Sequence, residues 1–461
     1  MSISKQLLAV ALGACLAAPA SAQEGLIEVY QRALMNDPAV REAEATYLAT
    51  AEVKPQARAA LLPGLSFGAA RSHNFNDTEV RSGATDPITG FPLGSRQTLE
   101  SDTTGYRLTL TQSLFDWSTF KTLEQADKRV LRAETDYRAA QQGLILRVAT
   151  AYFNVLAAED NLASAVAQRD SVSRQLEQSQ RRFEVGLIAI TDVQQSQAGY
   201  DDAVALEIES QRLLSTSHEQ LREIVGEIVP QLSAPLDDLP LLTPDPANAD
   251  EWVAVALDSN LALQSSRLGA DVANDQIKIE KGNRLPTLSL QATYNEDETS
   301  RVQTLFRQLV ETTPSTQLPQ GRTWRLDLTF PIYTGGVNRS RIQQSVYQHR
   351  AASDALERIA RQTERQTRDA YLGVIAEIQR VRALRQAVES NRTALRATEA
   401  GFEVGTQTTV DVLASQNNLR GAETRYSRSR YDYMLNVLRL KQAAGQLSET
   451  DVEQVDSWLQ Q

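Results

Sequence analysis

The sequence predicts a mixed α/β membrane protein that is written twice, with long helices and with strands of membrane-spanning length in each half. The prediction rests on motifs that recur at a nearly constant offset along the 461 residues, on proline-free tracts with a coiled-coil period, and on short segments that alternate apolar with polar residues.

The duplication is visible in ordered motifs. Residues 183–186 and 402–405 both read Phe-Glu-Val-Gly, and each copy is followed at the same spacing by Asp-Val and then by Ser-Gln. Further upstream, residues 62–66 match residues 285–289 at a similar offset. Because chance matches would not remain collinear, we infer a tandem duplication.

The helices are predicted by the absence of proline between residues 92 and 230 and after residue 331. Apolar residues in the first tract recur in steps of four and three, the period of a coiled coil, at Leu144, Val148, Ala151, Val155, Ala158, Leu162 and Ala165. We expect one long helix over residues 119–185, ended by Gly186, and shorter helices over residues 189–226 and 26–60 that stack end to end against it. The second half should repeat this arrangement.

Four segments alternate apolar with polar or small side chains, as strands with one apolar face do. Their apolar residues begin at Leu65, Tyr106, Leu288 and Trp324. We expect four strands of about 10 residues, enough to cross a bilayer at a tilt, joined by polar loops over residues 77–102 and 296–323. Four strands cannot close a barrel in lipid, so several copies of the chain would have to contribute. The alternative is a water-soluble sheet between coiled coils.

The first 22 residues are typical of a secretory signal peptide, with Lys5 before a short apolar run and small residues before the cleavage site at Ala22. A lipobox-like segment would alternatively make Cys15 a lipidation site. Acidic residues outnumber basic ones by 58 to 47, which argues against nucleic acid as a partner. One cysteine and three scattered histidines offer no metal, redox or triad pattern, so we expect no cofactor and no enzymatic activity.

Taken in order, these features make the chain resemble the TolC family of outer-membrane efflux ducts over nearly the whole mature sequence. The most specific segments are residues 151–156, 182–187 with 190–193, 331–336, 404–406 with 410–413, and the Leu-Pro turns at Pro63 and Pro286. The resemblance implies a homotrimer whose strands form one 12-stranded barrel and whose coiled-coil helices form a tunnel in the periplasm. It also implies a duct for drugs or proteins, in multidrug efflux or type I secretion, that docks with a periplasmic adaptor and an inner-membrane RND or ABC transporter.

On this resemblance the chain divides into a signal peptide (1–22), a first repeat (23–229), a proline-rich linker in the equatorial region (230–250), a second repeat (251–447) and a short C-terminal segment (448–461). The alternative is a periplasmic coiled-coil adaptor or stalk protein without a pore.

The resemblance assigns roles to the helix turns as well. Asp411 aligns with a pore-constriction aspartate, which threefold symmetry would turn into a cation-binding ring of carboxylates. The alternative for such an aspartate is a helix cap or a solvated surface charge. The family's second constriction aspartate is replaced here by Ala414.

The gate latch would be formed by Thr191, Asp192, Phe402 and Gln407. The family has tyrosine and arginine at the last two positions, whereas phenylalanine has no hydroxyl and glutamine cannot make a charge-assisted bond. We therefore expect a closed state that is less firmly latched. The adaptor-docking turns would be Val185, Gly186, Leu187, Val404, Gly405 and Thr406, although each glycine could simply supply the positive φ that ends a helix.

Overall fold

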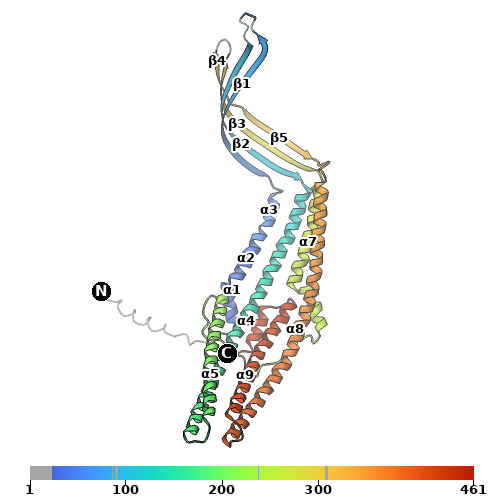
Figure 1. Cartoon of the computed structure of the whole chain (residues 1–461). Coiled ribbons are helices and arrows are strands. Elements are labelled where there is room, and N and C mark those ends of the chain that lie inside the picture. Colours follow the sequence, from blue (N-terminus) through green and yellow to red (C-terminus); the bar gives the residue numbers. More distant parts are fainter. Residues whose placement is uncertain (1–22, 86, 89–91, 237, 307–309, 461) are drawn as a thin grey trace, which may run out of the picture. The chain divides into compact units, whose positions relative to one another are not determined.

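The computed structural model describes residues 23–85, 87–88, 92–236, 238–306 and 310–460 (Figure 1). The predicted signal peptide and Cys15 lie outside the described residues. The chain divides into two compact units. The sheet unit comprises Ala49–Leu131 and Leu268–Ser353, and the helical unit comprises the rest of the described chain.

The sheet unit contains an antiparallel sheet in the order β1, β2, β3, with β4 and β5 sharing the far edge of β3. The described strands are β1 (Gly64–Thr85), β2 (Pro92–Phe115), β3 (Thr287–Phe306), β4 (Val310–Gln317) and β5 (Gln320–Thr329). Because β5 pairs with the first half of β3 and β4 with its second half, these strands occupy four positions across the sheet. β4 and β5 are interrupted at Pro319, which lacks the N–H that a continuous ladder would need.

The strands are longer than predicted, and the expected polar loops over residues 77–102 and 296–323 are wrong in most of their length. β1 and β2 remain paired from Gly64 and Thr111 to Thr85 and Pro92. The prediction ended each strand where the apolar alternation ended. Beyond that point the segments are rich in threonine, whose β-branched side chain favours extended backbone, so the ladder continues with mostly polar side chains on both faces.

The described helices follow a similar order in the two halves (Figure 1). The first half contains α1 (Leu26–Asn36), α2 (Pro38–Ala51), α3 (Val53–Ala59), α4 (Trp117–Glu184) and α5 (Ile190–Val225). The second contains α6 (Ala249–Ser259), α7 (Leu261–Gly282), α8 (Val337–Glu403), α9 (Thr409–Ala443) and finally α10 (Glu449–Asp456). The long helices are confirmed, since α4 has 68 residues and α8 has 67.

The prediction of one helix over residues 26–60 is wrong, because this segment forms α1, α2 and α3. Pro38 explains the first break: it has no N–H to continue α1, and it stands at the first position of α2, where proline is favoured. Nowhere in the described chain does a helix combine the length and the apolar composition that crossing a bilayer demands.

α4 starts where β2 ends, at a cap formed by Asp116. Its carboxylate accepts hydrogen bonds from the Ser118 N–H at 2.9 Å, the Ser118 hydroxyl at 2.6 Å and the Thr119 hydroxyl at 2.9 Å. Partial burial raises the pKa of Asp116, but these hydrogen bonds outweigh it and place the pKa below its usual value. The ionised side chain thus satisfies the free N–H groups of the first helical turn.

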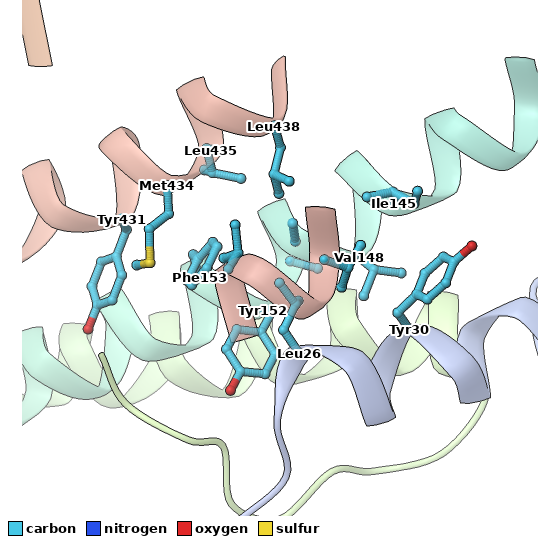
Figure 2. Packing of buried hydrophobic residues seen from close by; sticks show 14 of the residues in the cluster. Leu26, Tyr30, Ile145, Val148, Tyr152, Phe153, Tyr431, Met434, Leu435 and Leu438 are labelled. Carbon is cyan, nitrogen blue, oxygen red and sulfur yellow. The ribbon is translucent and has the colours of Figure 1, made fainter. Parts of the chain in front are cut away.

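The core of the helical unit gathers aromatic and aliphatic side chains from α1, α4 and α9 (Figure 2). Phe153 lies between two tyrosines. Its ring packs edge-on against the Tyr152 ring, with centroids 5.4 Å apart, and stacks on the Tyr431 ring, with centroids 5.7 Å apart. The Tyr152 hydroxyl donates to the Ser233 carbonyl at 2.8 Å. Burial raises the pKa of Tyr152, so its phenol remains protonated and able to donate.

The C-terminal segment completes this core, although the sequence suggested no role for it. The Trp458 ring stacks on Tyr433 of α9 with centroids 6.0 Å apart. At the other side of the segment, the Asp456 carboxylate accepts a hydrogen bond from the Ile27 N–H of α1 at 3.2 Å. The segment therefore joins α1 to α9.

Candidate functional site

The two long hairpins of the helical unit, α4–α5 and α8–α9, end in turns of the same design. In the first turn Gly186 has a φ of +75°, its N–H donates to the Phe183 carbonyl at 2.9 Å, and the Leu187 N–H donates to the Arg182 carbonyl at 2.8 Å. Gly405 repeats this geometry in the second turn with a φ of +82°. These hydrogen bonds define the Schellman motif, in which the positive φ favours glycine. Each glycine therefore ends its helix.

Apolar side chains around the turns point into solvent. Val185 is 70% exposed, Leu187 72% and Val404 76%. A Cβ atom added at Gly186 or Gly405 would meet nothing within 4 Å. Exposed aliphatic groups gathered at one end of a helical pair are typical of a surface that contacts another molecule.

The helices that leave the two turns begin differently. Asp411 forms a complete capping box with Thr408: its carboxylate accepts from the Thr408 N–H at 2.8 Å and from the hydroxyl at 2.7 Å, while the Asp411 N–H donates to that hydroxyl at 3.3 Å. The Asp192 carboxylate accepts a hydrogen bond from the Ala189 N–H at 3.3 Å, but Ala189 has no side-chain oxygen that could accept one from the Asp192 N–H. Hydrogen bonds from the Thr408 hydroxyl and N–H lower the pKa of Asp411, so it carries its charge at neutral pH.

Among the predicted latch residues, Phe402 is buried and only 8% exposed. The Arg182 guanidinium of the first hairpin lies over its ring, 4.9 Å from the centroid. Gln407 and Thr191 are exposed. Between the described residues of the two turns, no hydrogen bond joins Phe402 or Gln407 to Thr191 or Asp192. No role for Arg182 follows from the sequence, because basic residues such as Arg181 and Arg182 are ordinary in the last turn of a helix.

Each hairpin also contains a pair of facing hydroxyl groups that the sequence analysis did not recognise. The Ser179 and Ser196 oxygens lie 3.0 Å apart in the first hairpin, and the equivalent Thr398 and Ser415 oxygens lie 3.2 Å apart in the second. Both serines of the first pair are fully buried. A satisfied polar pair in an otherwise apolar seam fixes the register of the two helices.

The two hairpins contact each other above the turns. The Gln416 side chain of α9 donates to the Ser171 hydroxyl of α4 at 3.1 Å. Leu413 of α9 packs on Gly199 of α5 so closely that a Cβ there would lie 3.2 Å from its methyl carbon. Beside this contact lies a groove of about 550 Å³ between α4, α5 and α9, and Ala414 is among the residues that line it.

In the sheet unit, one face of the sheet carries an apolar band whose residues are exposed or half-buried. Its residues pair across the strands, for example Phe67 with Leu108 and Leu290 with Leu326. The band comprises Leu65, Phe67, Leu108, Leu110, Leu288, Leu290, Leu326 and Leu328. Tyr106, Tyr294 and Trp324 follow it on the same face, and Arg71, Glu296 and Arg322 come next. An apolar band bordered first by aromatic and then by charged residues is typical of a sheet embedded in a bilayer.

The opposite face of the same strands is small and polar. It presents Gly68, Thr109, Asn295, Arg325 and Asp327. A water-filled interior suits these side chains, whereas lipid would not.

Comparison with known proteins gives these features a common explanation. The family model described as outer membrane efflux protein matches residues 29–227 and 252–446. The outer membrane protein TolC of Vibrio cholerae is 37% identical over 460 residues, covering 99% of each chain. The alkaline protease secretion protein AprF of Pseudomonas aeruginosa is 28% identical, covering 94% of this chain and 86% of its own.

A solved structure shares the fold. The outer membrane protein VceC of Vibrio cholerae superposes with a TM-score of 0.71 at 17% identity, covering 91% of this chain and 96% of that chain. The two matched segments of the family model agree with the duplication seen in the sequence and in the order of elements. The alternative of a periplasmic stalk without a pore is therefore excluded. The chain belongs to the outer membrane efflux protein family, whose members are transport ducts rather than enzymes, and it is an outer-membrane efflux or secretion channel with its helical tunnel in the periplasm.

Proposed function

We propose that three copies of the chain assemble around one pore and that their strands close a single barrel of about 12 strands. The support is the pairing of the sheet: in the described chain β1 pairs with β2 alone, and β4 and β5 pair with β3 alone. Both outer edges thus carry backbone groups that lipid cannot satisfy. Pairing β1 of one copy with β4 and β5 of the next satisfies them and places the apolar band on the outside.

The channel acts as the exit duct of a tripartite system with a periplasmic adaptor and an inner-membrane RND or ABC transporter. The description of the family supports efflux, and the name of the alkaline protease secretion protein AprF supports secretion of proteins. The adaptor docks on the exposed turns, where Val185, Leu187 and Val404 offer aliphatic side chains around Gly186 and Gly405.

The pore closes at the same turns, with Asp411 at the constriction. In a threefold assembly its charge becomes a ring of three carboxylates, which focuses negative potential and binds cations. Asp411 is a helix cap, as the alternative in the sequence analysis expects, because it forms a capping box with Thr408. The observation that carries this proposal is that the cap holds a charged carboxylate at the first turn of α9, directly after the hairpin turn, where threefold symmetry would repeat it. Phe402 and Gln407 supply no hydrogen-bonding latch equivalent to the family's tyrosine and arginine, so the resting gate is leakier.

The test is block of the purified channel in planar bilayers by a trivalent cation added on the side of the turns. Asp411→Asn removes the charge, while its amide oxygen can still accept from Thr408. We expect the half-blocking concentration to rise about tenfold or more, since each lost carboxylate removes attraction of kcal/mol size in a narrow pore.

Asp192→Asn is the matched control, because Asp192 occupies the equivalent position in the first repeat and its backbone contact is equally preserved. Equal weakening of block by both variants, or unchanged block in Asp411→Asn, would contradict a constriction at Asp411.

A further inference from the structure

We propose that Arg182 is a gating residue, and that its cation–π contact with Phe402 holds the second hairpin against the first in the resting channel. The inference rests on the proposed function, in which the pore closes at the hairpin turns. It adds a residue and a type of interaction that the hydrogen-bonding latch does not include.

The contact is direct and joins the two turns. The Arg182 guanidinium lies 4.9 Å from the centroid of the Phe402 ring, well within the range of a cation–π interaction. Phe402 is only 8% exposed, so most of its ring is shielded from the water that would otherwise weaken the attraction. Arg182 is half-buried and keeps part of its guanidinium solvated.

Both partners are held by the turns themselves. The Arg182 carbonyl accepts the Leu187 N–H at 2.8 Å, and the Phe402 carbonyl accepts the Gly405 N–H at 3.2 Å. Each residue thus belongs to the hydrogen-bonded motif that ends its helix. A movement that separates the two hairpins at their turns has to separate the guanidinium from the ring.

The internal repeat shows that the contact is a specific feature rather than a general property of these turns. Phe183 is the equivalent of Phe402 but is 41% exposed, and Gly401 stands at the position equivalent to Arg182. The neighbouring Arg181 extends into solvent, with 80% of its side chain exposed and Glu177 4.0 Å away. Arg181 and Phe183 therefore provide matched controls within the same helical turn.

The experiment measures the open probability of the purified full-length channel in planar bilayers without an adaptor. Arg182→Gln and Phe402→Leu should each raise it by about three- to tenfold, because a partly exposed cation–π contact contributes about that factor to an equilibrium. The double variant should open no more than the stronger single variant, since either change alone removes the same interaction. Phe402→Trp, with the better π face, should lower the open probability.

Arg181→Gln and Phe183→Leu should leave gating unchanged, and retention of the assembled channel on native gels checks that each variant is folded. Additive effects in the double variant, or equal effects of the control variants, would overturn the role of Arg182. If trivalent-cation block still depends on Asp411 while the Arg182 variants gate normally, this inference fails and the proposed gate stands. If block is independent of Asp411, the proposed gate itself fails.

Discussion

At the scale of single residues, the sheet unit depends on a buried carboxylate. Asp275 of α7 is fully buried between Lys128 of α4, at 2.6 Å, and Lys278, at 2.7 Å. Burial raises the pKa of Asp275, but hydrogen bonds from the two lysines outweigh it, so the pKa lies below its usual value. One carboxylate shared by two ammonium groups ties α7 to α4.

Asp275→Asn should lower the free energy of unfolding by about 1–3 kcal/mol, because both ammonium groups lose their partner while their stems remain partly buried. Since the folded pKa of Asp275 is depressed, its contribution is present above the unfolded pKa of about 3.9 and is lost as pH falls through the folded value. The melting difference between wild type and variant should therefore shrink below about pH 4. Asp271→Asn, at an exposed position on the same helix, should melt like the wild type; equal destabilisation would contradict the role of Asp275.

At the scale of elements, the sequence predicts helix ends, which depend on neighbouring residues, but it does not predict contacts between different helices. The end of α4 was predicted because Gly186 interrupts a coiled-coil period, and both are readable along the chain. The outer parts of β1, β2 and β3 and the whole of β4 were not predicted, because a strand with mostly polar residues on both faces carries no apolar alternation. Two contacts join different helices: the hydroxyl pair of Ser179 and Ser196, and the contact of Arg182 with Phe402. No spacing in the sequence predicts such contacts.

Substitutions at Gly186 and Gly405 can test whether the turns serve as an adaptor-docking surface or only end the helices. Replacing both Gly186 and Gly405 with Asn retains a residue that tolerates positive φ, whereas replacing both with Leu adds bulk and strain of roughly 1–3 kcal/mol per turn. Because a Cβ meets nothing within 4 Å at either glycine, the added bulk projects into solvent, where the adaptor would dock. We expect the Leu variant to assemble but to lose export, measured as drug accumulation in cells and as trimer on native gels.

The Asn variant should retain most of the export activity. Loss of the trimer in the Leu variant would instead favour a purely structural role for the glycines, and export by the Leu variant would remove the turns from the docking surface.

At the scale of the whole molecule, one sequence has to satisfy lipid and water at the same time. The apolar band meets lipid with the side chains of alternate residues, and the residues between them meet the water of the pore. A neighbouring pair on β5 shows the principle: Leu326 pairs with Leu290 on the apolar face, and Asp327 pairs with Ser289 on the polar face. The apolar face needs lipid, because Leu326 on that face is 62% exposed in the single chain.

Lysine substitutions at these two adjacent positions should therefore have opposite consequences. Leu326→Lys places an ammonium group on the lipid face, at a cost of about 2–4 kcal/mol near the bilayer midplane, and in the proposed trimer this cost arises three times. We expect a marked loss of heat-resistant trimer from the outer-membrane fraction. Asp327→Lys leaves the side chain in the aqueous pore, so the trimer should remain abundant while the ion selectivity of the open channel shifts toward anions. Equal amounts of membrane-inserted trimer for both variants would mean that the apolar band does not face lipid, and the assembly of strands from neighbouring copies would then have to be abandoned.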